Sequence, residues 1–152
     1  MRIPATAAKI LTVGAASAAL VVGLTGSASA DTYAYDHEDP ISSGCADTAT
    51  TARSTAIYVN STQVGTIELR YSTACRTVWA RVRSTGPYGD ATVTRTKDWE
   101  WDRCTSLSYN SSMGQYTCYT PMLNDADMQS YAAGSASMSN GYRSNDYSTS
   151  AY

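Results

Sequence analysis

The clearest signal in the chain is a regular alternation of apolar and polar residues in its middle third. Apolar side chains stand at every second position between residues 64 and 72 and again between residues 77 and 84. A period of two is typical of a β-strand with one buried face. Residues 54–60 alternate less regularly, and the polar run at 60–63 is typical of a turn. Because the connections are too short for a crossover helix, we expect these segments to form an antiparallel meander.

Weaker patterns before and after the meander predict further short elements. Residues 86–90 contain two glycines and a proline, which mark a break before another strand. In chain order we expect a loop-like arm over 31–44, a short helix or turn over 46–53, a strand over 91–96, a hairpin of 106–109 and 115–122 around a loop at 110–114, a weak last strand over 129–138, and a fraying tail over 140–152. The predicted fold class is therefore all-β, a small antiparallel sandwich or a partly open barrel.

The first thirty residues differ in composition from the rest of the chain. Arg2 and Lys9 precede an apolar or small-residue run over 10–24, and the segment ends in Ala28-Ser29-Ala30. This order is typical of a secretory signal peptide. An apolar run of about 15 residues is too short to cross a bilayer core of roughly 30 Å. We therefore expect residues 1–30 to be removed, and residues 31–152 to form one secreted domain with no membrane anchor after cleavage.

The charge balance argues against two classes of partner. The chain contains 11 basic and 13 acidic residues, for a formal net charge of −2. The leader holds two of the basic residues and no acid, so the mature part has a net charge of −4. Proteins that bind nucleic acid or anionic lipid present a basic surface, which this composition does not predict. The chain also has 12 tyrosines and no phenylalanine, which suits a thin domain with a partly hydrated core.

All four cysteines, Cys45, Cys75, Cys104 and Cys118, follow the predicted cleavage site. An even number of cysteines in an exported chain is typical of disulfide bonds. Three pairings are open to them. We favour Cys45 with Cys75 and Cys104 with Cys118, because pairing neighbours closes two local loops. A zinc site is disfavoured, because the chain has one histidine and no Cys-x-x-Cys pair. We expect no metal and no cofactor.

The single histidine, His37, stands among acids in the N-terminal arm. A histidine base must be held within hydrogen-bonding reach of its substrate, and a loop-like arm is a poor place for that. Asp36, Glu38 and Asp39 form a weak calcium candidate, since the oxygen spacing and turn glycine of a calcium loop are missing. We therefore assign no catalytic residue to this segment.

The segment Asp98–Asp102 alternates acids with tryptophans. If it is extended, Trp99 and Trp101 share one face of the strand. Exposed indoles would stack on sugar rings, and with Glu100 and Tyr88 they form the candidate binding surface. The alternative is that both indoles close one side of the core. The shortage of other large apolar residues favours this second interpretation.

Paired carboxylates would suit a small glycoside hydrolase. That reaction needs two carboxyl groups facing each other across a cleft, and the candidates are Glu68, Asp98, Glu100 and Asp102. A domain of this length leaves little room for such a cleft. We interpret Glu68 as a surface charge pair with Arg70, and we expect the protein not to be an enzyme.

Several short runs of residues resemble one known family. These are Tyr35-Asp36, Asp39-Pro40, Gly44-Cys45, Val64 to Ser72 with its core Glu68-Leu69-Arg70-Tyr71-Ser72, Cys75, and Trp79-Ala80-Arg81. On these residues the chain is similar to the YjfA-like family of small secreted bacterial proteins, a domain of unknown function. The resemblance implies an exported, Streptomyces-type protein in which Cys45 pairs with Cys75. It implies no activity. It suggests packing roles for Leu69, Tyr71 and Trp79, and bonds to adjacent strands for Arg70 and Arg81.

Three hypotheses for function follow. The first is a non-enzymatic extracellular binding or adaptor module for a protein partner, within a larger secreted complex used against competitors, because tyrosine is favoured at interfaces. The second is a carbohydrate- or cell-wall-binding module that uses Trp99 and Trp101 on a polysaccharide. The third is a small carboxylate-dependent hydrolase.

Overall fold

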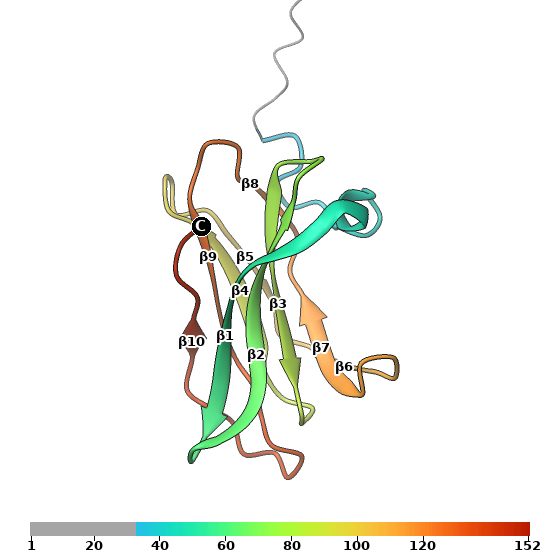
Figure 1. Ribbon diagram of the computed structural model, residues 1–152, viewed down its shortest axis with the longest axis vertical. Coiled ribbons are helices and arrows are strands. Elements are labelled where there is room, and N and C mark those ends of the chain that lie inside the picture. The colour runs from blue at the N-terminus through green and yellow to red at the C-terminus, as the bar shows by residue number, and fades with distance from the viewer. Residues whose placement is uncertain (1–32) are drawn as a thin grey trace, which may run out of the picture.

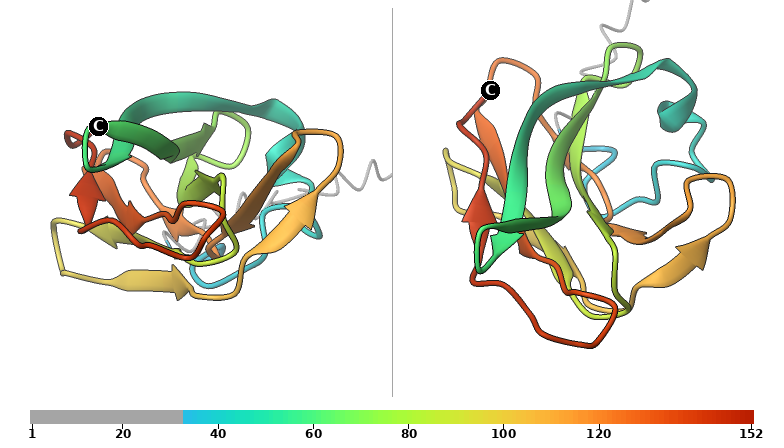
Figure 2. Two further views of the ribbon diagram at one scale, coloured as in Figure 1. Left: turned by 90° about the horizontal axis from the view of Figure 1, so that it is seen from below. Right: turned by 60° about the horizontal axis from the view of Figure 1, so that its bottom comes forward.

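The computed structural model describes residues 33–152, so the predicted signal peptide lies outside the described residues. Two antiparallel sheets pack face to face, one behind the other in Figure 1 and one above the other in the left view of Figure 2. The prediction of an all-β sandwich is confirmed. The two sheets remain separate hydrogen-bonded units, so they do not form a closed barrel.

The elements form two sheets of different size. Sheet A has the order β1-β2-β3-β7-β6, with β8 also pairing with β3, and sheet B has the order β10-β9-β4-β5. Among the described residues no helix is long and apolar enough to span a bilayer. The elements are η1 (Cys45–Thr48), a 3₁₀ turn, and the strands β1 (Ala49–Val59), β2 (Thr62–Ser72), β3 (Thr77–Ser84), β4 (Asp90–Arg95), β5 (Trp101–Cys104), β6 (Ser108–Asn110), β7 (Gln115–Tyr119), β8 (Leu123–Asn124), β9 (Ser130–Ser135) and β10 (Tyr147–Ser148).

The predicted meander forms the centre of sheet A. β2 pairs with β1 on one side and with β3 on the other, and its register places Leu69 opposite Ala80 and Ile67 opposite Val82. These side chains are fully buried in one core cluster with Val93 of sheet B. The intervening polar residues of β2 and β3 therefore point to the other face of sheet A. The predicted hairpin of β6 and β7 is also confirmed.

Two segments differ from their predicted conformation. The short helix or turn expected over 46–53 is limited to η1, and β1 already begins at Ala49. The first half of β1 is exposed or half-buried throughout, so it lacks the alternation that reveals a strand. The tail expected to fray contributes β10, and Tyr152 exchanges backbone hydrogen bonds of 3.0 and 3.2 Å with Ser130.

The N-terminal arm, residues 33–44, packs across one end of the sandwich (Figure 1). The His37 N–H donates to the Met122 carbonyl at 2.8 Å, and the Met122 N–H donates back to the arm at 2.9 Å. Arg95, which is 2% exposed, donates to both carboxylate oxygens of Asp36 at 2.8 and 3.0 Å. The arm is therefore held against both sheets.

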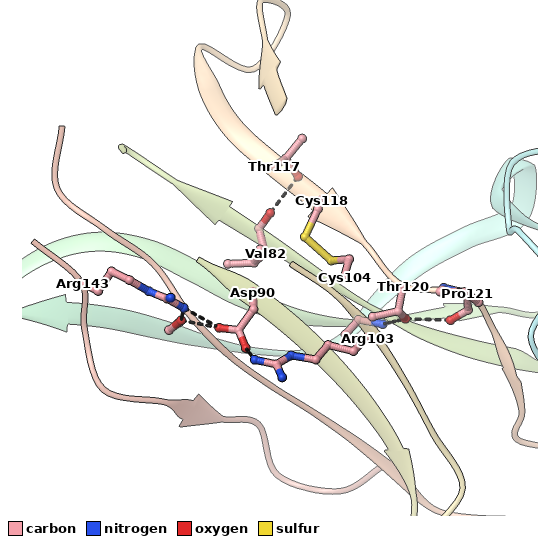
Figure 3. Close-up of a disulfide and its surroundings, with 11 residues drawn as sticks. Val82, Asp90, Arg103, Cys104, Thr117, Cys118, Thr120, Pro121 and Arg143 are labelled. Atoms are coloured by element: carbon pink, nitrogen blue, oxygen red, sulfur yellow. Dashed lines mark hydrogen bonds and ion pairs between the residues drawn. A yellow bond between two sulfur atoms is a disulfide. The ribbon is translucent and has the colours of Figure 1, made fainter. Parts of the chain in front are cut away.

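The favoured pairing of the four cysteines is confirmed. Cys45–Cys75 joins η1 to the turn between β2 and β3, across 30 residues of chain. Cys104–Cys118 closes 14 residues and joins β5 of sheet B to β7 of sheet A (Figure 3). The second disulfide is therefore a covalent link between the sheets.

Candidate functional site

The outward face of sheet A carries the polar residues of the central strands. Alternation along β2 places Glu68 and Arg70 on this face, and alternation along β3 adds Trp79, Arg81 and Arg83. In the register Glu68 lies opposite Arg81, and Arg70 lies opposite Trp79. We call these five residues the arginine face.

Glu68 is the buried anion of the arginine face, with an exposed fraction of 3%. Its Oε2 accepts from Arg81 Nε at 2.8 Å and lies 2.6 Å from Arg81 Nη2, and its Oε1 lies 2.5 Å from Arg83 Nη2. The interpretation of Glu68 as a surface pair with Arg70 is wrong. Arg81 lies directly opposite Glu68 and is closer to it than a residue two apart on the same strand, and Arg83 reaches the carboxylate from the diagonal position opposite Thr66.

Arg70 has hydrogen bonds to neutral oxygens only. Its Nη1 donates to Thr51 Oγ1 at 2.5 Å, and its Nη2 donates to the Ala49 carbonyl at 3.1 Å. Burial lowers the pKa of Arg70, and the neighbouring charge of Arg81 lowers it further. The expected bonds of Arg70 and Arg81 to adjacent strands are confirmed, but the charge of Arg70 has no carboxylate partner among the described residues.

A pocket of about 160 Å³ opens beside Arg70 on this face. The arm and η1 form one wall, β7 forms the opposite wall, and Trp79, which is 4% exposed, lies between them. The lining combines apolar side chains with two guanidinium groups. The lining residues are Pro40, Ile41, Ala46, Ala49, Arg70, Trp79, Arg81 and Tyr119.

Asp39 shapes the arm at the rim of the pocket. Its Oδ1 accepts from the N–H groups of Ile41 at 2.8 Å and Ser42 at 2.9 Å, and its Oδ2 accepts from the Tyr119 hydroxyl at 3.3 Å. The hydrogen bond from the Ser42 N–H is the main cause of a lowered Asp39 pKa. Burial and the nearby Asp39 charge raise the pKa of Tyr119. A protonated Tyr119 and an ionised Asp39 therefore join the two walls.

The tryptophan turn is a second surface, at the β4–β5 connection. Trp99 and Trp101 are 69% and 57% exposed, so the favoured interpretation that they close the core is wrong. Trp99 adopts a positive φ of 62° and lies in a turn, while Trp101 begins β5. The turn is held by Arg95, which bonds both carboxylate oxygens of Asp98 at 2.8 and 2.9 Å. The buried guanidinium of Arg95 thus holds the turn in place through Asp98, and both indoles face solvent.

His37 lies beside this turn. Its Nδ1 is 2.9 Å from Asp102 Oδ2, and its Nε2 is 3.7 Å from Glu100 Oε1. Burial raises the pKa of Asp102, and the hydrogen bond with His37 offsets part of that effect. The imidazole therefore bridges the arm and the turn through two carboxylates. The weak calcium set is not assembled, because Asp36 is bound to Arg95, and no metal-binding group of three or more such residues occurs in the described part of the chain.

The remaining candidate residues lie apart from the tryptophan turn. Tyr88 precedes β4 while Trp99 follows it, and a strand of six residues spans roughly 20 Å. Tyr88 thus lies at the opposite end of β4, beside Gly141. Glu68 belongs to sheet A, whereas the acids of the turn belong to sheet B. Of the proposed carboxylates, Glu100 and Asp102 are brought together by His37, and Glu68 is separate.

An open groove of about 490 Å³ lies beside the inter-sheet disulfide. None of its lining side chains is an acid or a base, and hydroxyl and amide groups predominate. The lining residues are Cys104, Thr105, Ser106, Ser108, Tyr109, Asn110, Thr117, Cys118 and Tyr119.

A known family matches the part of the chain that contains the arginine face and the tryptophan turn. The family described as "Protein of unknown function (DUF2690)" matches residues 33–133, about two thirds of the chain. The chain belongs to this family. It is also 37% identical over 116 residues to the uncharacterized protein YjfA of Bacillus subtilis (strain 168), covering 70% of this chain and 74% of that protein. The predicted resemblance is confirmed at the family level. No solved structure matches the chain.

Within this DUF2690 match lie the arginine face, the pocket and the tryptophan turn, whereas Arg143 and β10 lie beyond it. The pocket could not be predicted from the sequence, because its walls come from segments about eighty residues apart. A second buried anion, Asp90, was not predicted either, and it bonds Arg103 at 2.5 Å and Arg143 at 3.1 Å (Figure 3). One signal was available for the arginine face, namely that Glu68, Arg70, Trp79 and Arg81 all occupy the polar phase of two alternating strands.

Proposed function

We propose that this protein is an extracellular, non-enzymatic binding module that engages a protein partner through the pocket on the arginine face. The observation that carries the proposal is the pocket's lining of tryptophan, tyrosine and two arginines. These three residue types dominate the energetic centres of protein interfaces. Ile41, which is 61% exposed at the rim, adds an apolar contact that a partner would cover.

The covalent framework supports an extracellular setting. Disulfides persist in oxidising compartments and are rare where thiols are kept reduced. All four cysteines are bonded, and the described chain has no free thiol. A binding module that works outside the cell would use this framework to keep its pocket preformed.

The placement of the acids favours binding over hydrolysis. A glycosidase needs two carboxyl groups across a cleft, and Glu68 is instead enclosed by Arg81 and Arg83. Glu100 and Asp102 both face His37 and line neither the pocket nor the groove. Binding would therefore take place at the pocket, and the acids would serve as structural contacts.

The test is partner capture followed by titration. Tagged protein is incubated with culture fluid of the producing organism, the retained protein is purified, and its affinity is measured by calorimetry. We expect Ile41→Asp to weaken binding by at least about tenfold, or roughly 1.4 kcal/mol, because a partner that covers this position would have to desolvate the new carboxylate. Tyr142→Asp, at a site 69% exposed near the other end of β3, is the matched control and should bind like the wild type. Equal affinities for the two variants would contradict the proposal.

A second function is favoured by the exposure of the tryptophan turn. Two indoles whose Cα atoms lie within about 7 Å, as spacing of two residues requires, offer π faces to the C–H groups of sugar rings. The protein would then sediment with chitin, cellulose or peptidoglycan. Trp99→Ala with Trp101→Ala should abolish this sedimentation, and Tyr109→Ala, at an aromatic that is 60% exposed on the other sheet, should not change it. Sedimentation that survives the double substitution excludes this function.

A further inference from the structure

We propose that the pocket on the arginine face recognises an acidic peptide segment, with a carboxylate bound between Arg70 and Arg81 and a neighbouring apolar side chain inserted against Trp79. This inference rests on the proposed function and names the chemistry of the partner.

The arginine face has more cations than its anion can neutralise. Glu68 contacts Arg81 and Arg83, which leaves one positive charge from that group and a second from Arg70. Asp39 at the rim is ionised and offsets one of these charges, but its oxygens accept hydrogen bonds from the arm and from Tyr119 rather than from an arginine, so one positive charge remains. This excess of positive charge occurs in a chain whose formal net charge is −2, so it is a local feature and not a consequence of overall composition.

Arg70 also lacks a charged acceptor. Its guanidinium reaches one hydroxyl and one carbonyl, and it bonds no carboxylate among the described residues. A guanidinium group binds a carboxylate through two parallel hydrogen bonds, a geometry that neutral oxygens do not provide. A carboxylate that entered the pocket beside Arg70 would supply the missing charge and a planar pair of acceptors.

The size and lining of the pocket limit the ligand. A volume of about 160 Å³ is well below the roughly 300 Å³ at which small-molecule sites begin. Four of the lining residues, Pro40, Ile41, Ala46 and Ala49, present apolar surface next to the arginines. A single apolar side chain adjacent to a carboxylate fits this combination. A nucleic acid would need a continuous basic surface, which a pocket walled by apolar residues does not offer.

The first experiment uses small probes that differ only in charge. N-acetyl-leucine carries a carboxylate and an apolar side chain, and N-acetyl-leucinamide carries the same side chain without the charge. Both are titrated into the isotopically labelled protein, and the Trp79 indole N–H and Arg70 Nε–H resonances are followed. We expect saturable shifts with N-acetyl-leucine and about tenfold weaker binding of the amide, since hydrogen bonds to charged groups are worth roughly this factor. Equal binding of both probes, or no binding of either, would overturn the inference.

The second experiment changes the protein. Arg70→Gln should lower the affinity for N-acetyl-leucine about tenfold, whereas Arg103→Gln, the same change on the outer face of sheet B, should have no effect. At the exposed rim, Ile41→Asp and Ile41→Lys remove the same apolar contact with opposite charge. We expect Ile41→Asp to bind the probe more weakly than Ile41→Lys, and neither change involves a buried group. The reverse order would contradict a carboxylate ligand.

The two proposals fail in distinguishable ways. If Arg70→Gln binds the captured partner as tightly as the wild type while Ile41→Asp does not, the acidic ligand is wrong and the docking surface stands. If neither substitution weakens partner binding, the proposed function fails as well. If both weaken it and added sodium chloride weakens the wild-type complex, the carboxylate contact is supported.

Discussion

Arg95 shows how one buried cation organises two segments that are far apart in the chain. It bonds Asp36 of the arm, Asp98 of the tryptophan turn and the Asn124 carbonyl, and its guanidinium lies 4.7 Å from the centre of the Tyr33 ring. Burial lowers the pKa of Arg95, but the hydrogen bonds that it donates to Asp98 and Asp36 outweigh that effect and raise it. The arm that walls the pocket and the turn that exposes the indoles therefore depend on the same side chain.

Replacing this cation should be costly. Arg95→Met leaves Asp36 half-enclosed without its partner, and loss of one member of a buried ion pair costs about 3–5 kcal/mol. Urea unfolding should show this loss in the free energy of unfolding. Arg76→Met is the matched control, because Arg76 and Asp127 form a pair that is 51% and 91% exposed and is worth less than about 1 kcal/mol. Similar costs for the two variants would show that Arg95 has no special role.

Asp125 is a buried acid with a different kind of environment. It is 6% exposed, burial raises its pKa to about 6, and the Ser130 hydroxyl donates to its Oδ1 at 2.7 Å. The folded protein keeps a proton on Asp125 that the unfolded chain releases near its ordinary pKa of 3.8. The proton therefore favours the folded state at low pH, and this advantage is lost as the pH rises through about 6.

Asp125→Asn should remove this dependence, because a neutral amide can still accept from Ser130. Between pH 4 and pH 7 the wild type should lose up to about 3 kcal/mol relative to the variant, as a pKa difference near two units requires. The measurement is urea unfolding of both proteins at several pH values. A difference between them that stays constant over this range would show that Asp125 is ionised when folded.

At the scale of elements, the alternating segments could be predicted and the exposed ones could not. β2 and β3 were predicted to within two residues, because each buries one face and shows polar residues on the other. β1 was predicted to begin five residues late, since its first half has no buried face. The arginine face was visible as residue types, but the pairing of Glu68 with β3 depends on a register that one strand does not encode. The packing of the arm beside the pocket could not be predicted either, because it depends on contacts between residues about eighty positions apart.

Gly65 of β2 lies close to β3 and to Ala136, the residue that follows β9 of sheet B. A Cβ there would lie 2.3 Å from the Arg83 carbonyl oxygen and 2.7 Å from the Ala136 Cβ. Gly65→Ala should therefore force β2 away from β3 and sheet B, with a loss of about 3 kcal/mol, the upper end for overpacking. Gly114→Ala, in a hairpin with nothing within 4 Å but a φ of 65°, should cost only about 1 kcal/mol. Thermal unfolding distinguishes these values, and equal midpoints would contradict the close packing at Gly65.

For the whole molecule, the two disulfides supply much of the stability of a thin sandwich. By the chain-entropy relation, closing 30 residues contributes about 3.6 kcal/mol and closing 14 residues about 3 kcal/mol. Domains of this size have a total stability of about 5–15 kcal/mol. The core of small apolar residues is therefore supplemented by covalent links, one of which joins the two sheets.

Removing the disulfides one at a time should show this. Cys45→Ala with Cys75→Ala should lower the free energy of unfolding slightly more than Cys104→Ala with Cys118→Ala, because its loop is longer and Cys45 is fully buried. The protein with all four cysteines replaced should be largely unfolded by circular dichroism at 37 °C. Native spectra for that protein would show that the packed core suffices without the links.

The same two bonds set how the molecule responds to tension. A pull on the two ends of the described chain passes directly through each sulfur–sulfur bridge, so the 30- and 14-residue spans carry no load. At about 3.5 Å per extended residue, roughly 150 Å of contour length stays hidden while the bridges are intact. A module joined to two bodies would thus lengthen under tension only through the segments outside the two loops, and the hidden length would be released only after reduction.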